Sequence, residues 1–181
     1  MGSTLFWRGR FVDALRWLPP SRERGWTLAR LGQRDAALDQ PQDAALHFYL
    51  DEPETCLKRL GPADTPIEAA RMELLRYWAN TRLAEPADEA RAHWALATLR
   101  RMAPSEEARG LAVYAEAAFR RHPVHALAHL DHALERFARF GLHHLEERLL
   151  EHKACALEAA GMLAEADRFR HAAAEVAKRQ R

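Results

Sequence analysis

Four histidines at helical spacing are the residues of this sequence whose types and positions could do chemistry. They are His122, His125, His129 and His132, and they are separated by three, four and three residues. This spacing places them on one face of a helix, away from its apolar residues. Histidines four residues apart, such as His125 and His129, are able to chelate Zn²⁺ or Ni²⁺. Because a third ligand on the same helix would be strained, we favour a solvated polar face.

Two functions remain open for this histidine face. Its imidazoles gain charge below about pH 6.5, so the face would then hold an anion or a partner more strongly. Alternatively, His125 and His129 make the protein a metal-responsive helical protein. The adjacent pair His143 and His144 point about 100° apart on a helix, so we do not expect them to bind a metal jointly.

Motifs of known enzyme classes are not found in the sequence. There is no glycine-rich phosphate loop, no G-x-S-x-G, no C-x-x-C and no H-E-x-x-H. The serines stand where a helix cap or a turn is expected. The two cysteines, Cys56 and Cys155, are predicted to be reduced and buried. We therefore expect a protein that is not an enzyme and holds no cofactor.

The composition of the 181 residues favours an all-α protein. The hydrophobic fraction is 48% and the charged fraction 29%, as in soluble globular proteins. Alanine, leucine, arginine and glutamate favour helices and are abundant, whereas isoleucine and valine are rare. The net charge of +1 gives no general attraction to nucleic acid or anionic lipid. No segment resembles a membrane span or a signal peptide, which predicts a cytoplasmic protein.

Prolines and glycines divide the sequence into helices of two kinds. Residues 1–60 are expected to form short, irregular helix pairs, and residues 66–178 longer and more regular pairs, within a single domain over 1–181. The periodicity predicts long helices at 66–84, 86–101, 106–121, 123–140, 141–160 and 161–178. Gly141 and Gly161 end two of them. Trp78 and Trp94 fall at predicted core positions.

A pattern recurs at the junctions between helices. A turn residue is followed within a few residues by a small residue, at Ala14, Ala37, Cys56, Ala90, Ala126 and Ala166. The last three junctions are 34, 36 and 40 residues apart, close to the period of about 34 residues in tetratricopeptide repeats. The pattern resembles the tetratricopeptide-repeat (TPR) family, whose second helix needs a small residue near its start. The resemblance covers residues 66–178 and, more loosely, 1–60.

The resemblance implies a right-handed α-α superhelix, a TPR-like solenoid of antiparallel helix pairs without a sheet. The sequence departs from the family in two ways. Most positions at which the family has its tryptophan–glycine pair or its proline hold other residues here, and the first helix pairs are short. A non-repetitive helical bundle is the alternative. Such solenoids bind peptides or helices on a concave face lined by the first helix of each pair. That face corresponds here to Met72, Leu75, Ala79, Arg82, Leu111, Ala115, Phe119, Arg148, Glu151, Cys155 and Glu158.

The implied function is that of an adaptor or scaffold, which also occurs as a part of bacterial regulatory systems. The partner would be a protein or peptide segment. The lysine and asparagine clamp with which the family holds the C-terminus of a bound peptide is missing, so an apolar or amphipathic segment is expected. The basic pairs Arg100–Arg101 and Arg120–Arg121 stand at helix C-terminal ends, where they stabilise helices, so nucleic-acid binding is not expected.

Large apolar residues gather near the N-terminus. They are Leu5, Phe6, Trp7, Phe11 and Trp17. The ends of a solenoid need a polar cap or a neighbour; the C-terminal end is polar, and the N-terminal end is expected to be open. Either this N-terminal aromatic cluster folds back onto the next helix pair, or it forms an interface with a second copy of the protein and makes a homodimer.

Overall fold

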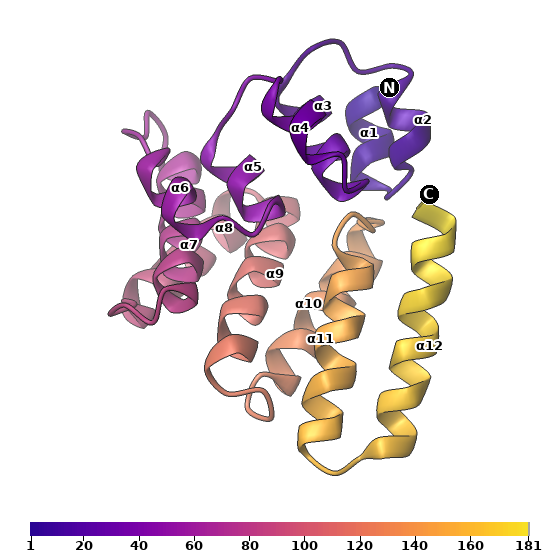
Figure 1. The fold of residues 1–181 in the computed structure, drawn as a ribbon. Coiled ribbons are helices and arrows are strands. Elements are labelled where there is room, and N and C mark those ends of the chain that lie inside the picture. Colours follow the sequence, from indigo (N-terminus) through magenta and orange to yellow (C-terminus); the bar gives the residue numbers. More distant parts are fainter. Residues whose placement is uncertain (181) are drawn as a thin grey trace.

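The computed structural model describes residues 1–180, and every regular element in that range is a helix (Figure 1). The short helices come first: α1 (Gly2–Trp7), α2 (Phe11–Leu15), α3 (Arg22–Arg30), α4 (Arg34–Leu38), α5 (Ala44–Tyr49) and α6 (Pro53–Lys58). The long helices follow: α7 (Pro66–Arg82), α8 (Glu89–Met102), α9 (Pro104–Arg121), α10 (Leu127–Phe140), α11 (Glu146–Ala159) and α12 (Leu163–Gln180). The prediction of an all-α protein is confirmed.

Helices that are neighbours in the sequence pack against each other in space. Among the long helices, α7 packs on α8, α9 on α10 and α11 on α12. Successive pairs are joined because α9 also contacts α7 and α11. In the view of Figure 1, α9 and α11 lie on the near side, with α8 and α10 behind them. Within residues 1–180, no helix is long and apolar enough to cross a membrane.

Local signals in the sequence set most helix ends. Thr65 begins α7 as its N-cap and accepts a hydrogen bond from the backbone N–H of Glu68 at 3.2 Å, which is one half of a capping box. Gly141 and Gly161 follow α10 and α11 with φ values of 62° and 79°. This left-handed conformation favours glycine. The predicted division of the C-terminal region at these two glycines is therefore confirmed.

The helix predicted for residues 123–140 begins later, at Leu127. A residue before proline is driven out of the helical region, and His122, which precedes Pro123, has φ −148° and ψ 88°. Residues 123–126 form a turn between α9 and α10. His122 and His125 therefore do not lie on one helix with His129 and His132. The prediction of a single four-histidine face is wrong.

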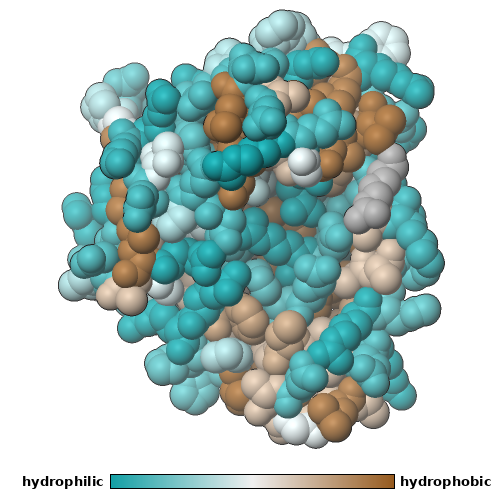
Figure 2. Space-filling model, in the orientation of Figure 1, coloured by the Kyte–Doolittle hydropathy of each residue, from teal (hydrophilic) through white to brown (hydrophobic). Residues whose placement is uncertain are grey.

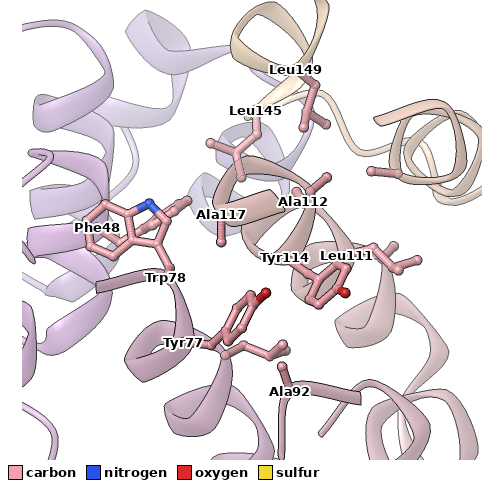
Figure 3. Close-up of a cluster of buried hydrophobic side chains, with 14 of the residues drawn as sticks. Phe48, Tyr77, Trp78, Ala92, Leu111, Ala112, Tyr114, Ala117, Leu145 and Leu149 are labelled. Atoms are coloured by element: carbon pink, nitrogen blue, oxygen red, sulfur yellow. The ribbon is translucent and has the colours of Figure 1, made fainter. Parts of the chain in front are cut away.

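The largest core lies between α7, α8, α9 and α10 (Figure 3). Trp78 is fully buried, as predicted, and its ring meets the ring of Phe48 edge-on at 5.0 Å. Gly110 allows α9 to approach α7 closely, because a Cβ atom there would lie only 2.7 Å from Cδ1 of Leu74. Trp94, by contrast, is 50% exposed. It lies off the buried face of α8, so its prediction as a core residue is wrong.

The N-terminal aromatic cluster is covered by later helices of the same molecule. Phe6 and Phe11 are buried. The ring centroid of Phe6 lies 6.0 Å from that of Trp26 in α3 and 5.9 Å from that of Tyr49 in α5. The cluster thus folds back onto the following helices, which was one of the two predicted alternatives. Trp17 is the member that stays exposed, at 61%.

The first helix also reaches the C-terminal half of the molecule. The backbone N–H of His143, between α10 and α11, donates to the carbonyl of Trp7 at 2.8 Å. The side-chain amide of Gln180 donates to the carbonyl of His143 at 2.6 Å. The two ends of the described residues therefore lie side by side in Figure 1. The expectation of an open N-terminal end is wrong, because α1 lies against the connection between α10 and α11.

The buried position of Phe6 makes a first prediction. Phe6→Ala should lower the free energy of unfolding by about 3–5 kcal/mol, because it removes a fully buried ring from a packed aromatic cluster. Trp17→Ala, in the same segment but exposed, should lower it by less than about 1 kcal/mol. Urea denaturation of the two variants and the wild type measures both values. Equal losses would contradict the packing described here.

Candidate functional site

A cavity of about 600 Å³ lies between the short N-terminal helices and the long helices α7 and α9. This volume is within the range of about 300–1,000 Å³ that is usual for ligand sites. The cavity is lined by side chains of α1, α3, α5, α7 and α9 and by the connection before α11. Its large apolar and aromatic lining residues are Trp7, Trp26, Phe48, Tyr49, Met72, Leu74, Leu75, Val113 and Leu145.

One wall of the cavity is aromatic. The ring centroids of Trp7 and Trp26 lie 5.9 Å apart, and those of Trp26 and Tyr49 lie 6.0 Å apart. The indole N–H of Trp26 donates to Oδ1 of Asp43 at 3.0 Å. The same carboxylate oxygen accepts from the backbone N–H of Leu46 at 2.8 Å and so caps α5. The indole of Trp26 is therefore held to the start of a helix, and the aromatic wall is fixed in place.

A guanidinium group lies against this wall. Arg109 of α9 places its guanidinium carbon 3.5 Å from the ring centroid of Trp7, a cation–π contact. Arg109 donates to Oε1 of Glu106 at 2.5 Å, and Arg71 of α7 donates to Oε2 of the same carboxylate at 2.8 Å. Two guanidinium groups thus share one carboxylate. Burial lowers the pKa of Arg109, and its buried Nε atom has no hydrogen-bond partner among the described residues.

His144 closes the inner end of the cavity. Its ring centroid lies 4.7 Å from that of Trp7, and the residue is 1% exposed. Burial holds the pKa of His144 well below its usual value, so the imidazole is neutral at pH 7. Its Nδ1 atom is buried without a partner among residues 1–180. The neighbouring His143 pairs with Glu146 at 2.7 Å. Both histidines lie in the connection before α11 and not on a helix, because the helix predicted for residues 141–160 begins only at Glu146.

The residues predicted to bind a partner lie in three different environments. Met72 and Leu75 line the cavity. Ala79, Leu111 and Ala115 are buried in the main core. The alanine- and leucine-rich faces of α7 and α9 pack against neighbouring helices, so these three side chains are not on the surface.

The remaining predicted residues lie in a polar region between α7, α9 and α11. Arg82 donates to Asp51 at 3.0 Å, and Arg148 forms an ion pair with Glu116. Figure 2 shows mainly hydrophilic residues across the middle of the face on which α9 and α11 lie. Glu151, Cys155 and Glu158 are exposed on α11.

The polar region contains one fully buried carboxylate. Glu116 accepts a hydrogen bond from the indole N–H of Trp78 at 3.0 Å and is 2% exposed. Burial raises the pKa of Glu116, and the charge of Arg148 opposes this. Close by, the ring of Phe119 stacks on that of His152 at 4.5 Å, and burial lowers the pKa of His152 to about 3. Phe119 is therefore partly covered within the molecule.

The cysteines and the other histidines differ in burial and in their contacts. Cys56 is buried, and burial raises its pKa to about 12, whereas Cys155 is exposed, which corrects the prediction that both are buried. His129 packs edge-on against Tyr114 at 5.1 Å. Within residues 1–180, no group of three or more His, Cys, Asp or Glu side chains could hold a metal ion. In that part of the chain, His125 and His129 belong to no such group.

The sequence did not indicate the aromatic wall as a site. Trp7, Trp26 and Tyr49 come from three separate short helices, and His144 follows more than ninety residues after them. The signal in the sequence is the concentration of aromatic residues before residue 50. That signal does not indicate which segments contact one another in the folded protein. Comparison of the sequence with protein-family models, with curated proteins and with solved structures found no match in any of the three.

The buried carboxylate makes a second prediction. Glu116→Gln keeps an acceptor for the indole of Trp78 but leaves Arg148 without its buried counter-charge. The free energy of unfolding should fall by about 3 kcal/mol. Glu158→Gln removes an exposed carboxylate that pairs with Arg170 and should cost less than about 1 kcal/mol. Urea denaturation compares the two variants, and equal losses would show that the buried pair stabilises no more than a surface pair.

The neutral state of His144 makes a third prediction. An unfolded histidine has a pKa near 6.5, so below that pH the unfolded protein binds a proton that folded His144 does not. This group therefore contributes a loss of stability of about 2 kcal/mol between pH 7.5 and pH 5. His144→Gln removes this contribution. Between the two pH values, the free energy of unfolding of the variant should therefore fall by about 2 kcal/mol less than that of the wild type. Urea denaturation at the two pH values measures it.

His125→Gln, which changes an exposed histidine, is measured beside it as a control for the loss of an imidazole. If His144→Gln keeps the wild-type pH dependence, then His144 takes up its proton in the folded protein as it does in the unfolded one.

Proposed function

We propose that the protein is a non-enzymatic interaction module that binds a segment of another protein in the cavity. The observation that carries this proposal is the aromatic wall with its stacked guanidinium, which lines the cavity between α3, α5, α7 and α9. Tryptophan, tyrosine and arginine dominate the binding energy of protein interfaces. Trp7, Trp26, Tyr49 and Arg109 bring these residue types together around a space of about 600 Å³.

The sequential packing of helix pairs supports a TPR-like adaptor or scaffold. In this proposal the pairs α7–α8, α9–α10 and α11–α12 form a right-handed superhelix, of the kind found in bacterial regulatory systems. The bound segment is apolar or amphipathic. Its site overlaps the surface expected from the family at Met72 and Leu75 and extends from there to the short N-terminal helices.

A photo-crosslinking amino acid at two methionine positions tests the proposed site. Met72 lines the cavity, whereas Met102, at the end of α8, is 47% exposed and outside it. With the reactive residue at position 72, irradiation in cells should give a discrete adduct with a partner protein. The same residue at position 102 should give none.

A cavity-filling variant supplies the second half of this test. Val113→Trp places a large side chain into the open space and should abolish the adduct at position 72, while the melting temperature stays that of the wild type. Adducts that are equal at both positions, or that persist in Val113→Trp, would refute the cavity as the binding site.

A further inference from the structure

We infer that His144 makes the docking of α1 sensitive to pH, so that acid releases α1 from the connection between α10 and α11 (residues 141–145). Because Trp7 of α1 lines the cavity, this release would open one of its walls. The release concerns the fold itself, whereas its effect on a bound segment rests on the proposed function. The inference follows from the position of His144, from the charges around it and from the separate apolar cluster to which α1 belongs.

His144 lies inside the contact that holds α1 in place. Its ring centroid is 5.5 Å from that of Phe6 and 4.7 Å from that of Trp7, both in α1. Phe137 of α10 lies at 5.2 Å and Tyr49 of α5 at 6.4 Å. Only 1% of His144 is exposed. Since α1 supplies two of these rings, water reaches the imidazole when α1 moves away from the connection.

The ionised groups that act on His144 are positive. Burial holds the pKa of His144 well below its usual value, and the charges of Arg109 in α9 and Arg30 in α3 lower it further. The nearby carboxylates Glu106 and Glu147 accept hydrogen bonds from these two arginines. A proton added to the imidazole would therefore stand near two guanidinium groups whose own counter-charges are already engaged.

The other groups around His144 compensate little for an added proton. The carbonyl of Trp7 favours the protonated imidazole, but it already accepts the backbone N–H of His143 at 2.8 Å. The face of the Trp7 ring could attract a cation, yet the guanidinium of Arg109 lies 3.5 Å from its centroid. Burial raises the pKa of Tyr49, which stays neutral, and His143 lowers the pKa of His144. Acid thus favours a hydrated imidazole.

The first helix belongs to a small apolar cluster of its own. Phe6, Phe11, Ala14 and Leu18 form this cluster, and none of them is part of the main core around α7 and α9. Trp7 packs against both. Most of the buried surface of the long helices therefore stays covered when α1 leaves, and this local opening costs less free energy than complete unfolding.

The pH range of the response follows from the pKa of a hydrated histidine, which is near 6.5. Above that pH, neither the docked nor the released form holds the proton, so this group has no effect. Below it, His144 takes up a proton only in the released form, and the ratio of released to docked α1 grows by up to about tenfold per pH unit. Between pH 7.5 and pH 5 the ratio should rise about thirtyfold.

Fluorine nuclear magnetic resonance of the protein labelled with fluorinated tryptophan tests the inference. Trp7 reports on α1, and Trp78, which is fully buried in the main core, reports on the long helices. Spectra are compared at the two pH values in one concentration of urea at which the docked and the released signals of Trp7 are both visible. We expect the released signal of Trp7 to grow about thirtyfold relative to the docked signal, while the signal of Trp78 stays that of the folded protein.

Two variants assign the response to His144. In His144→Phe a ring remains among the aromatic neighbours but takes up no proton, so the ratio at Trp7 should change by less than about twofold. His144→Gln, which also cannot be protonated, gives the same test if the phenylalanine variant does not fold. His125→Gln changes an exposed histidine outside this contact and should keep the wild-type response at Trp7.

The outcomes separate this inference from the proposed function. A ratio at Trp7 that does not change with pH refutes the inference. So does the loss of the Trp78 signal in step with that of Trp7, because the whole protein then unfolds. A response that persists when His144 is replaced assigns it to other groups and also overturns the inference. None of these results affects the photo-crosslinking test. Conversely, adducts that persist in Val113→Trp refute the proposed function and leave the response of Trp7 standing.

Discussion

The packing of α1 against the connection between α10 and α11 is the contact on which the rest of the structure depends. Phe6 and Trp7 surround His144, with ring centroids 5.5 and 4.7 Å from the imidazole. The backbone hydrogen bond from His143 to Trp7 fixes this contact at 2.8 Å. It joins residues about 136 positions apart in the sequence, and it forms the inner end of the cavity. It adds to the packing of α5 and α6 on α7 and fixes α1 over the long helices.

This contact explains why polar groups of the cavity are left without partners. The rings of Phe6, Trp7, Tyr49 and Phe137 pack around His144, and this burial excludes water from its Nδ1 atom and holds the imidazole neutral. Arg109 is desolvated against Trp7 in the same way. Unpaired buried polar groups destabilise a fold, and the aromatic packing around them offsets that cost. Sites of this kind, stable but incompletely hydrogen-bonded, are typical of surfaces that bind a ligand.

The sequence predicted the helices well because their ends are local. Thr65, Gly141 and Gly161 act within one turn of their own helix. The same local chemistry explains one error: Pro123 breaks the helix that the histidine spacing predicted to be continuous. Trp94 was misplaced because the buried face of α8 is built from alanines, a weaker periodic signal than a tryptophan. The cavity could not be predicted, because its walls come from segments whose contact depends on the tertiary packing of α1.

The position of the cavity changes how a partner would act on the fold. Surfaces on the first helices of the long pairs were expected to bind, but Ala79, Leu111 and Ala115 are used for helix packing. The available surface instead lies where the short helices meet α7 and α9. A segment bound there touches Trp7 and Trp26 on one side and Met72 on the other. Since a ligand stabilises the state to which it binds, it would strengthen the docking of the N-terminal helices as it binds. In the proposed function, recognition of a partner and docking of the N-terminal helices would therefore be coupled through the same aromatic residues.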